Sequence, residues 1–335
     1  MTHGLRWGVL GTGFAADLFV RDLVRAGFDV RAVGSRDAEA GRRFARAHGV
    51  PVAHGSYPEL VASSDLDVIY VSSPHPLHRD HAMLALLAGK HVLLEKPFAL
   101  NRAEAEEIVA TADDLGLVVL EAMWTRWLPH MLRIHEIIDQ GTIGELVSVT
   151  AEHSQWLSDD PAHRLNSLEL GGGALLDLGI YPVSFASDLL GAPLEVRATS
   201  TPTSTGVDAQ TAAVIRYGGD RLALVHCALN APGANRAVVT GTRGRIEIDE
   251  VWYAATSFTV FDAQGGATER FESDVDGRGM HFQATELERL VSTGSRRSPR
   301  MPSEESIAIM ATLDDIRAQI DLVYPGEDPA RRPVR

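Results

Sequence analysis

Cysteine is almost absent from this sequence. The single cysteine, Cys227, excludes a disulfide bond within the chain and is typical of a protein from a reducing cytoplasm. No apolar run approaches the length needed to cross a bilayer, and the first residues, MTHGLRWGVLG, lack the basic and apolar segments of a secretory signal. We therefore expect a cytoplasmic globular protein without a membrane partner.

Positive charge is also scarce. Lysine and arginine together number 31 against 45 aspartates and glutamates, so the formal net charge is −14. A polyanion would meet net repulsion, which argues against nucleic acid as a partner, whereas a helix N-terminus can still bind a small anion. The chain of 335 residues exceeds the size at which one core usually stops growing, so two domains are expected.

Short apolar runs and helical segments alternate from residue 5 to about residue 123. The runs LDVIYVSSP and HVLLEKP are continuously apolar, as in strands that are buried on both faces of a parallel sheet. This alternation predicts an α/β fold, with a doubly wound parallel sheet of the Rossmann type in a domain of residues 1–123. Asn101 and Glu104 have the spacing of a capping box for one of its helices.

Residues 124–335 follow a different pattern. From Glu195 to Phe271 short strands succeed one another with turn signals, and two helices, near 279–293 and 303–323, end the chain. We predict an α+β domain with a mainly antiparallel sheet over residues 124–335. Whether the last helix packs back on the first domain is left open.

The segment VLGTGFAAD places Gly11, Gly13 and Ala16 in the G-x-G-x-x-A spacing directly after the first expected strand. The first glycine permits a tight turn, the second lets the backbone approach a pyrophosphate, and the alanine allows the helix to pack closely on the strand. Because a strand precedes the motif and a helix follows it, we interpret it as a dinucleotide-binding turn. A purely structural glycine turn is the alternative.

The end of the second expected strand distinguishes NADP from NAD. An NAD site usually offers an acid to the ribose 2′-hydroxyl, whereas a 2′-phosphate needs a donor or a cation. Ser35 and Arg36 stand at this place, and the first acid is Asp37. We therefore expect NADP as the preferred cofactor, with NAD still possible. In the alternative interpretation Arg36 points into solvent and Asp37 only caps the next helix.

Three glycines lead into an apolar segment, GGGALLDLGIYP, which carries one acid and one phenol. In a helix Asp177 and Tyr181 are four residues apart and share a face. Such a pair could exchange a proton with a substrate. An acid near a helix N-terminus and a tyrosine at a domain boundary is the structural alternative.

Several segments together resemble the Gfo/Idh/MocA family, which is named for glucose–fructose oxidoreductase and inositol dehydrogenase. They are the cofactor turn, VSSPHPLHRDHA, LLEKPFAL, GGGALLDLGIYP and the final MPSEESIAIMATLDDIRAQIDLVYP, and they occur in the family's order. LEAMWTRWLP and the tyrosine ending of the glycine segment are similar to the branch with dimeric dihydrodiol dehydrogenases and pyranose dehydrogenases. Inositol dehydrogenases carry histidine at the position of Tyr181, so inositol specificity is not transferred.

The resemblance implies a second domain with an open sheet that forms homodimers or higher homo-oligomers. It also implies hydride transfer between a nicotinamide and a hydroxyl or carbonyl carbon of a sugar, polyol or cyclic diol. By matching motifs, the catalytic residues are Lys96, Asp177 and Tyr181. The expected cofactor-binding residues are Gly11, Thr12, Gly13, Phe14, Ala15, Ser35, Arg36, Ser72, Ser73, Pro74, His75, His78, Glu95, Lys96 and Pro97.

These residue types suit the reaction. A free tyrosine has a pKa near 10, and a nearby ammonium stabilises the phenolate and lowers that value. Tyr181 is therefore the expected general acid/base, Lys96 supplies the positive field, and Asp177 fixes a substrate hydroxyl or holds the lysine. The Lys96–Pro97 bond is a candidate cis peptide.

Further residues complete the expectations. His75, His78 and His81 are spaced by three, but no cysteine or carboxylate cluster completes a metal site, so no metal is expected. Candidate substrate contacts are Trp124, Arg126, Trp156, Arg164 and His281, with core packing as the alternative for the aromatic ones. Two other functions stay open: a glycoside-processing enzyme that oxidises its substrate transiently with tightly bound NAD, and a non-catalytic NADP(H) sensor.

Overall fold

A computed structural model describes residues 4–327 of the chain. The chain forms two compact units. The first contains the residues before Thr125 together with Gly277–Ile307, and the second contains Thr125–Asp276 and the residues after Ile307. The first unit thus includes a C-terminal segment that a single boundary near residue 124 leaves out.

The first unit is built on a six-stranded sheet in which every pairing is parallel, as expected for a Rossmann fold. Its order is β3-β2-β1-β4-β5-β6, so the chain reverses direction across the sheet between β1 and β4. Ligands of such sheets bind beyond the carboxyl ends of the strands at this reversal. The strands are β1 (Arg6–Leu10), β2 (Asp29–Gly34), β3 (Val52–His54), β4 (Val68–Val71), β5 (His91–Glu95) and β6 (Val119–Ala122).

Apolar strands and a capped helix show why the chain forms these elements of the first unit. All four residues of β4 are buried, as the unbroken apolar run VIYV predicts. The Asn101 side chain accepts the Glu104 N–H at 3.0 Å, and the Glu104 carboxylate accepts the N–H of Leu100, so the predicted cap forms with its return bond one residue earlier. The helices are α1 (Phe14–Ala26), α2 (Ala38–His48), α3 (Tyr57–Ala62), α4 (His78–Leu87) and α5 (Arg102–Asp114), with the short η1 (His75–Leu77) before α4.

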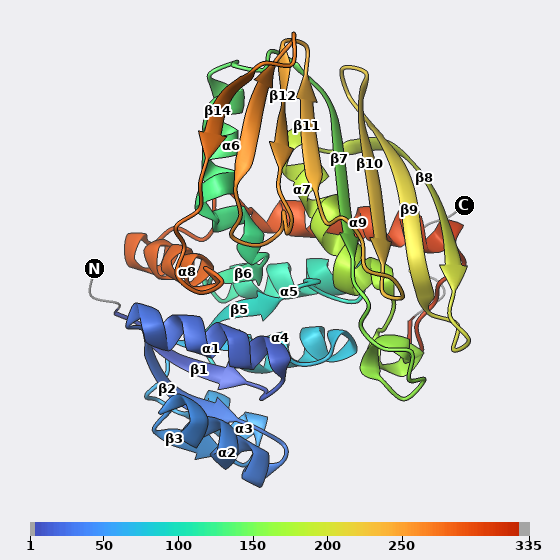
Figure 1. Ribbon diagram of the computed structural model, residues 1–335. Helices are drawn as coiled ribbons and strands as arrows, with labels where there is room; N and C mark the ends of the chain where they lie inside the picture. Colours follow the sequence, from blue (N-terminus) through green and yellow to red (C-terminus); the bar gives the residue numbers. More distant parts are fainter. Residues whose placement is uncertain (1–3, 328–335) are drawn as a thin grey trace. The chain divides into compact units, whose positions relative to one another are not determined.

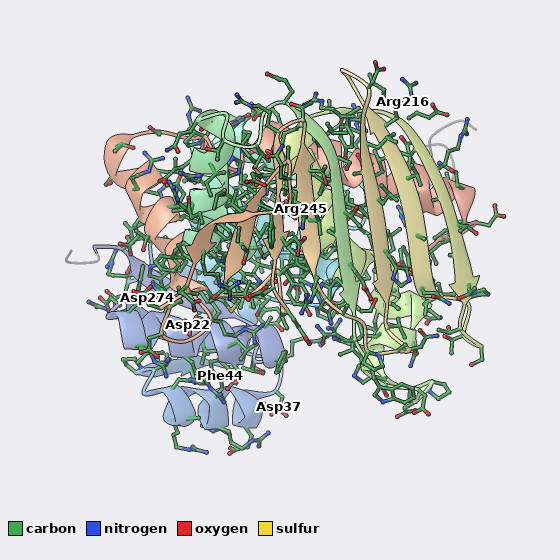
Figure 2. All side chains as sticks on the ribbon, turned by 45° about the horizontal axis from the view of Figure 1, so that its top comes forward. Asp22, Asp37, Phe44, Arg216, Arg245 and Asp274 are labelled. Carbon is green, nitrogen blue, oxygen red and sulfur yellow. The ribbon has the colours of Figure 1, made fainter. Side chains whose placement is uncertain are left out.

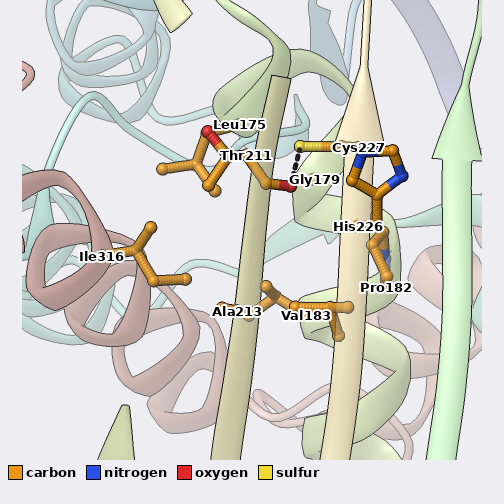
Figure 3. Close-up of a pocket in the computed structure, with 10 residues that line it drawn as sticks. Leu175, Gly179, Pro182, Val183, Thr211, Ala213, His226, Cys227 and Ile316 are labelled. Atoms are coloured by element: carbon orange, nitrogen blue, oxygen red, sulfur yellow. Dashed lines mark hydrogen bonds between the residues drawn. The ribbon is translucent and has the colours of Figure 1, made fainter. Parts of the chain in front are cut away.

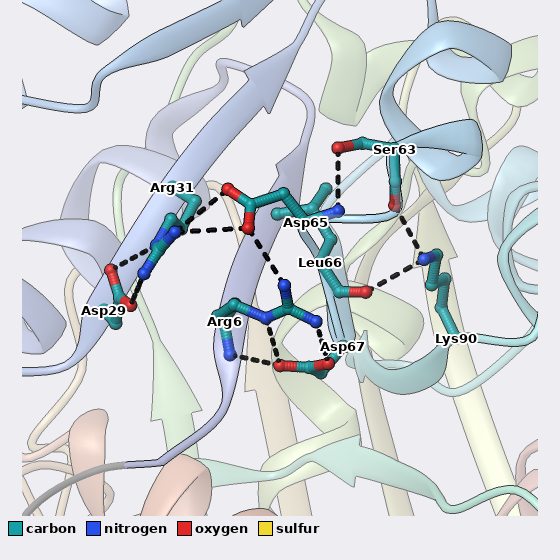
Figure 4. Close-up of polar contacts among 8 residues, drawn as sticks. All are labelled: Arg6, Asp29, Arg31, Ser63, Asp65, Leu66, Asp67 and Lys90. Carbon is teal, nitrogen blue, oxygen red and sulfur yellow. Dashed lines mark hydrogen bonds and ion pairs between the residues drawn. The ribbon is translucent and has the colours of Figure 1, made fainter.

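Charged side chains tie the amino ends of the strands together (Figure 4). Arg6 makes two bonds to the Asp67 carboxylate, at 2.7 and 2.9 Å, and a third to Asp65. Arg31 joins Asp29 to the same Asp65. The ion pairs link β1, β2 and the entry to β4 at the edge opposite the carboxyl ends, which leaves those ends free for ligand binding.

A late segment of the chain completes the first unit. Helix α8 (His281–Thr293) contacts α1, and its Glu288 accepts the indole N–H of Trp7 at 3.0 Å. Asp22 of α1, which is buried, accepts the backbone N–H groups of Arg278 and Met280 just before α8. The penultimate helix therefore packs on the Rossmann sheet unit, and α9 (Ser303–Gln319) belongs to the second unit from residue 308 onward.

The second unit contains an eight-stranded sheet in the order β14-β13-β12-β11-β7-β10-β9-β8. All pairings are antiparallel except that of β7 with β10, so the sheet is mixed and mainly antiparallel, as expected. The strands are β7 (Leu146–Ser154), β8 (Pro193–Pro202), β9 (Asp208–Tyr217), β10 (Arg221–Ala228), β11 (Ala237–Gly241), β12 (Gly244–Ile248), β13 (Phe258–Asp262) and β14 (Ala267–Phe271).

The two faces of this sheet differ. Helices α6 (Pro129–Asp139), α7 (Ile180–Leu190) and the later part of α9 cover one face (Figure 1), where alternate strand residues such as Val149, Ile215 and Ala223 are buried. Arg216 and Arg245, labelled in Figure 2, belong to the alternate set that faces away from these helices. Among the described residues of the second unit, no helix covers that second face in Figure 1.

One helical stretch, Leu168–Leu190, is apolar and long enough to cross a membrane by length and composition, so the expectation that no apolar run approaches this length is wrong. Within it 83% of the most apolar window is buried inside the structure. Its hydropathy is therefore that of a core helix packed on the sheet.

Candidate functional site

The two glycines of the first turn serve different purposes. Gly11 has φ of +110°, and a Cβ there would lie 2.9 Å from the Ser72 hydroxyl, so the fold itself requires glycine. Gly13 has an ordinary φ of −81°, and a Cβ there would meet no protein atom within 4 Å. Neither conformation nor packing demands glycine at this position, which is at the start of α1. The space beside it fits a pyrophosphate that approaches the backbone and the helix N-terminus.

Phe14, which directly follows Gly13, is exposed. Thr12 precedes Gly13 and Ala15 follows Phe14 in the same turn. The free N–H groups at the N-terminus of α1 carry partial positive charge, and the only acid of its first turn is Asp17. The predicted turn residues are thus brought to one place at the carboxyl end of β1.

The end of β2 is followed by one cation, Arg36, and by an acid that caps the next helix. Asp37 caps α2 by accepting the N–H groups of Glu39 and Ala40, at 2.9 and 3.0 Å, so its carboxylate is committed to the helix. Arg36 is exposed, and Ser35 is buried with its hydroxyl accepting the Asp37 N–H. His81 lies near enough to Arg36 that this charge contributes, after burial, to lowering the pKa of the imidazole.

The turn that carries Lys96 is held by buried polar groups. Lys96 directly follows β5, and the bond from Lys96 to Pro97 is cis, as the sequence suggested. Glu95 accepts the backbone N–H of Lys96 at 3.2 Å and a short 2.5 Å bond from the Tyr70 hydroxyl. On the far side of the turn, buried Glu121 accepts the N–H of Phe98 at 3.0 Å. Lys96 is one of only two lysines in the chain.

His78, an expected cofactor-binding residue, lies between two turns of the first unit. The side chain is completely buried, and its two ring nitrogens each lie 2.8 Å from a carbonyl oxygen, one of Ser73 and one of Pro97. His75 is also buried and packs edge-on against the His78 ring. Burial lowers the pKa of His78 to about 4. The residue joins the turn after β4, which includes Ser73 and Pro74, to the Lys96 turn.

The glycine-led segment of the second unit is helical, but its first part is not an α-helix. Leu175–Gly179 form a π-helical turn that leads into α7, so Asp177 lies in the π-turn and Tyr181 lies in the first turn of α7. A π-turn widens the helix locally and often occurs at functional sites. Asp177 and Tyr181 are both nearly buried, at 8% and 7% exposure.

Arg164, a predicted substrate residue, lies beside the Asp177 carboxylate. Its guanidinium Nη2 lies 3.3 Å from Asp177 Oδ1. Arg164 itself is half exposed, and it starts the short η3 (Arg164–Asn166) ahead of the glycines. An arginine and a carboxylate side by side can donate to and accept from neighbouring hydroxyl groups of one ligand.

A cluster beside Tyr181 was missed in the sequence. His153, near the end of β7, stacks on Tyr253 with a centroid distance of 3.6 Å and meets the Tyr181 ring edge-on at 4.9 Å. The amide nitrogen of Gln155 donates to the Tyr253 hydroxyl at 2.9 Å and lies 2.7 Å from His153 Nε2. In the sequence, only the polar residues at the end of the β7 run, AEHSQ, could have indicated this cluster. No motif near Tyr253 indicated that it belongs there.

The other substrate candidates make contacts of their own. Arg126 is buried, pairs with Asp188 at 2.9 Å and donates to the Ser184 carbonyl and hydroxyl, so it fastens η2 (Trp124–Trp127) to α7. Trp124 is buried under the guanidinium of Arg278, and His281 packs on Phe282 at the start of α8. Trp156 is 59% exposed.

A small cavity adjoins the π-turn (Figure 3). It lies among Leu175, Gly179, Ala213 and Cys227, and the Cys227 thiol lies 3.6 Å from the Thr211 carbonyl oxygen, to which it donates. Burial raises the pKa of this thiol well above its ordinary value, so the group stays protonated. A Cβ at Gly179 would lie 2.9 Å from the Cys227 sulfur, which explains this glycine by packing.

Among the described residues 4–327, no group of three or more histidine, cysteine, aspartate or glutamate side chains is placed to hold a metal ion. The three histidines near η1 instead make separate contacts. His81 meets the Tyr57 ring, and the other two pack on each other.

Comparison with known proteins identifies relatives along nearly the whole chain. Residues 5–123 match the model of an oxidoreductase family with an NAD-binding Rossmann fold, and residues 131–247 match the GFO/IDH/MocA C-terminal domain. The trans-1,2-dihydrobenzene-1,2-diol dehydrogenase of Bos taurus is 33% identical over 334 residues, covering 96% of this chain and 99% of that protein. The Mus musculus dehydrogenase of the same name is 34% identical over 336 residues, with the same coverage.

Solved structures agree with this assignment. A 3-ketoreductase from Actinomadura kijaniata, KijD10, in complex with NADP and TDP-benzene, superposes with a TM-score of 0.85 at 28% identity, covering 95% of this chain and 98% of that one. Variants of that ketoreductase with one tyrosine changed to phenylalanine or one lysine changed to alanine match with TM-scores of 0.84 and 0.81. An aldose–aldose oxidoreductase from Caulobacter crescentus, at 23% identity and a TM-score of 0.85, covers 95% of this chain and 98% of its own and shares the fold.

Proposed function

Because the chain belongs to the Gfo/Idh/MocA family of oxidoreductases, we propose that it transfers hydride between NADP and a hydroxyl or carbonyl carbon of a sugar, polyol or cyclic diol. The observation that carries the proposal is the Lys96 turn, a lysine held by buried groups at the carboxyl end of β5 in a dinucleotide-binding sheet. NADP is favoured over NAD by Arg36, by the commitment of Asp37 to its helix, and by the NADP bound to KijD10. NAD remains the alternative cofactor.

Gly11, Gly13 and the N-terminus of α1 would hold the pyrophosphate, and Ser35 with Arg36 the 2′-phosphate. The nicotinamide supplies the hydride chemistry when it is bound. The protein must then manage one proton and the charge that develops on the substrate oxygen.

Tyr181 is proposed as the general acid/base that moves this proton at its phenolic oxygen. Lys96 is proposed to stabilise the phenolate or the developing oxyanion through its ammonium group. Asp177, with Arg164 beside it, orients a substrate hydroxyl. The proposal is supported by the relative KijD10, of which a tyrosine-to-phenylalanine variant and a lysine-to-alanine variant have been solved in complex with NADP.

Two further features of the protein are proposed. The uncovered sheet face carries the exposed apolar side chains Val214, Leu222 and Leu224, and we place a homodimer contact there because an exposed apolar patch on a sheet favours association.

The single, buried Cys227 is consistent with a cytoplasmic location.

Absorbance at the NADPH band against sugars, polyols, dihydrodiols and dicarbonyls tests the activity. With a turned-over substrate, Lys96→Met and Tyr181→Phe should each lower kcat about 100-fold or more while NADPH binding, followed by fluorescence, stays nearly unchanged. Lys90→Met, which removes the other lysine at the opposite end of β5, and Tyr217→Phe should leave the kcat of folded protein near that of the wild type. Unchanged kcat in Lys96→Met and Tyr181→Phe would refute these roles.

The same assay separates the alternatives. A glycoside-processing enzyme should keep NAD through purification and show no net turnover of added NADP. A sensor should bind NADPH and turn over none of the panel.

A further inference from the structure

Asp208 is a buried acid that the proposed reaction does not use. It is the first residue of β9 and is 3% exposed. Its Oδ2 accepts the backbone N–H of Leu175 at 2.8 Å and the hydroxyl of Thr211 at 2.7 Å. Leu175 is the first residue of the π-turn that contains Asp177.

The glycine-led helix has no cap of its own. A helix leaves its first N–H groups without a partner, and a side chain just before the helix usually accepts one of them. Here the preceding residues are Gly171, Gly172 and Gly173, which have no side chain, and no side-chain cap belongs to either helical segment. Asp208, 33 residues further along the chain than Leu175, takes the place of that cap.

The glycine run and Asp208 fit each other. Gly173 has φ of +115°, and a Cβ there would lie only 2.1 Å from Asp208 Oδ1. The buried Tyr324 hydroxyl donates to the Gly172 carbonyl at 2.7 Å, so the glycine run is held from a second side. A larger residue at Gly173 would displace the carboxyl group from the helix start.

We propose that Asp208 is a positioning residue that caps the glycine-led helix and thereby sets where Asp177 and Tyr181 lie. This inference rests on the proposed function for its catalytic consequence, although the cap itself does not. Leu175 is two residues before Asp177, so freeing its N–H loosens the turn that aims the acid. The widened π-turn has fewer alternative bonds to hold it than an α-helix of the same length.

The surroundings of Asp208 agree with this role. Burial raises the pKa of its carboxyl group to about 7, while the Thr211 hydroxyl and the Leu175 N–H act in the opposite direction. A burial cost of this kind is tolerated where the group makes contacts that an apolar residue cannot make. An amide at the same position could still accept the Leu175 N–H without any charge.

Two substitutions separate capping from general packing. Asp208→Asn keeps an oxygen that can accept the Leu175 N–H, whereas Asp208→Ala removes it. We expect Asp208→Ala to lower kcat about tenfold or more, with a smaller change in KM and with unchanged NADPH affinity, and Asp208→Asn to restore kcat to within about threefold of the wild type. Asp208→Ser, whose hydroxyl is too short to reach Leu175, serves if the alanine variant does not fold.

A second measurement does not depend on activity. Amide hydrogen exchange, followed by mass spectrometry, should accelerate in residues 171–182 of Asp208→Ala, while the rest of the second unit and Asp208→Asn keep wild-type rates. Thr211→Val, which removes the side-chain donor to Asp208, should leave the 171–182 rates near those of the wild type. Wild-type exchange in Asp208→Ala, equal acceleration throughout the unit, or an asparagine variant as damaged as the alanine one would overturn the inference. If the exchange result holds but Lys96→Met and Tyr181→Phe keep full kcat, the cap stands and the proposed function fails.

Discussion

The guanidinium of Arg164 lies 3.3 Å from the carboxylate of Asp177. The two residues come from different segments, the short η3, which is half exposed at Arg164, and a π-turn in which Asp177 is almost buried. The pair combines hydrogen-bond donors and acceptors in one place. In the proposed function it orients a hydroxyl-bearing substrate.

Arg164→Ala should lower kcat/KM roughly tenfold, mainly through KM, because one charge-assisted hydrogen bond on a half-exposed pair is lost. Arg164→Lys, which keeps the charge, should recover part of this loss. Steady-state kinetics with a turned-over substrate check the values.

Arg133→Ala is the matched control, since Arg133 pairs with Glu269 at 2.9 Å elsewhere in the second unit. It should leave KM unchanged. Equal KM values for wild type and Arg164→Ala would mean that Arg164 plays no part in orienting the substrate.

Arg36→Ala should shift the cofactor preference from NADP toward NAD. The arginine is exposed at the end of β2 and is the nearest cation in sequence to the expected 2′-phosphate. Without the guanidinium that would pair with the 2′-phosphate, the ratio of kcat/KM for NADP to kcat/KM for NAD should fall about tenfold or more. Arg42→Ala, on the exposed surface of α2 and paired with Glu39, should keep the wild-type ratio. An unaltered ratio in Arg36→Ala would count against the phosphate role.

The stability of the second unit should fall in acid because of His130. Burial lowers the pKa of this histidine from its ordinary 6.5 to about 4, and its Nε2 lies 3.1 Å from the Trp252 carbonyl oxygen. Since the unfolded chain binds the proton more tightly, the contribution of neutral His130 is complete above about pH 6.5 and is lost as the pH falls toward 4. The loss should reach up to about 3 kcal/mol.

His130→Gln keeps an N–H donor but cannot titrate in this range. Urea unfolding at several pH values should show that the stability advantage of the wild type over His130→Gln shrinks between pH 7 and 4.5. A constant difference across that range would show that His130 does not titrate in this way.

Leu224→Arg should weaken self-association. Leu224 is 45% exposed and lies opposite Val214 and Thr150 in the middle of the uncovered sheet face. A buried unpaired guanidinium in a dimer contact is costly, so the variant should shift from dimer to monomer in light scattering after gel filtration. Leu115→Arg, an equally exposed leucine of the first unit, should stay dimeric. A monomeric wild type would refute the dimer, and a dimeric Leu224→Arg would place the contact elsewhere.

Local patterns in the sequence were sufficient for much of the fold. The alternation of apolar runs and helices led to the parallel sheet, and the cap at Asn101 formed because its partner Glu104 is only three residues away. The glycine spacing at Gly11 and Gly13 could be interpreted for the same reason, since a tight turn depends on the conformations of adjacent residues. The helical character of the segment around Asp177 also follows from local spacing, although its π-turn does not.

Contacts between distant segments could not be obtained in this way. Arg126 looked available from its neighbours, but Ser184 and Asp188 enclose it, some 60 residues later in the chain. His78 had the position of a cofactor residue, and only the packing of two turns showed that it joins their carbonyl groups.

The sequence by itself determined the family, the order of the elements and the short motifs, because these depend on residues within a few positions of one another. The tertiary structure alone decided that Asp208 meets Leu175, that His153 and Tyr253 flank Tyr181, and that α8 returns to the first unit. Such pairs are brought together by the burial of apolar faces across the whole unit, and the periodicity of any one segment records only which face is apolar, not which partner it meets.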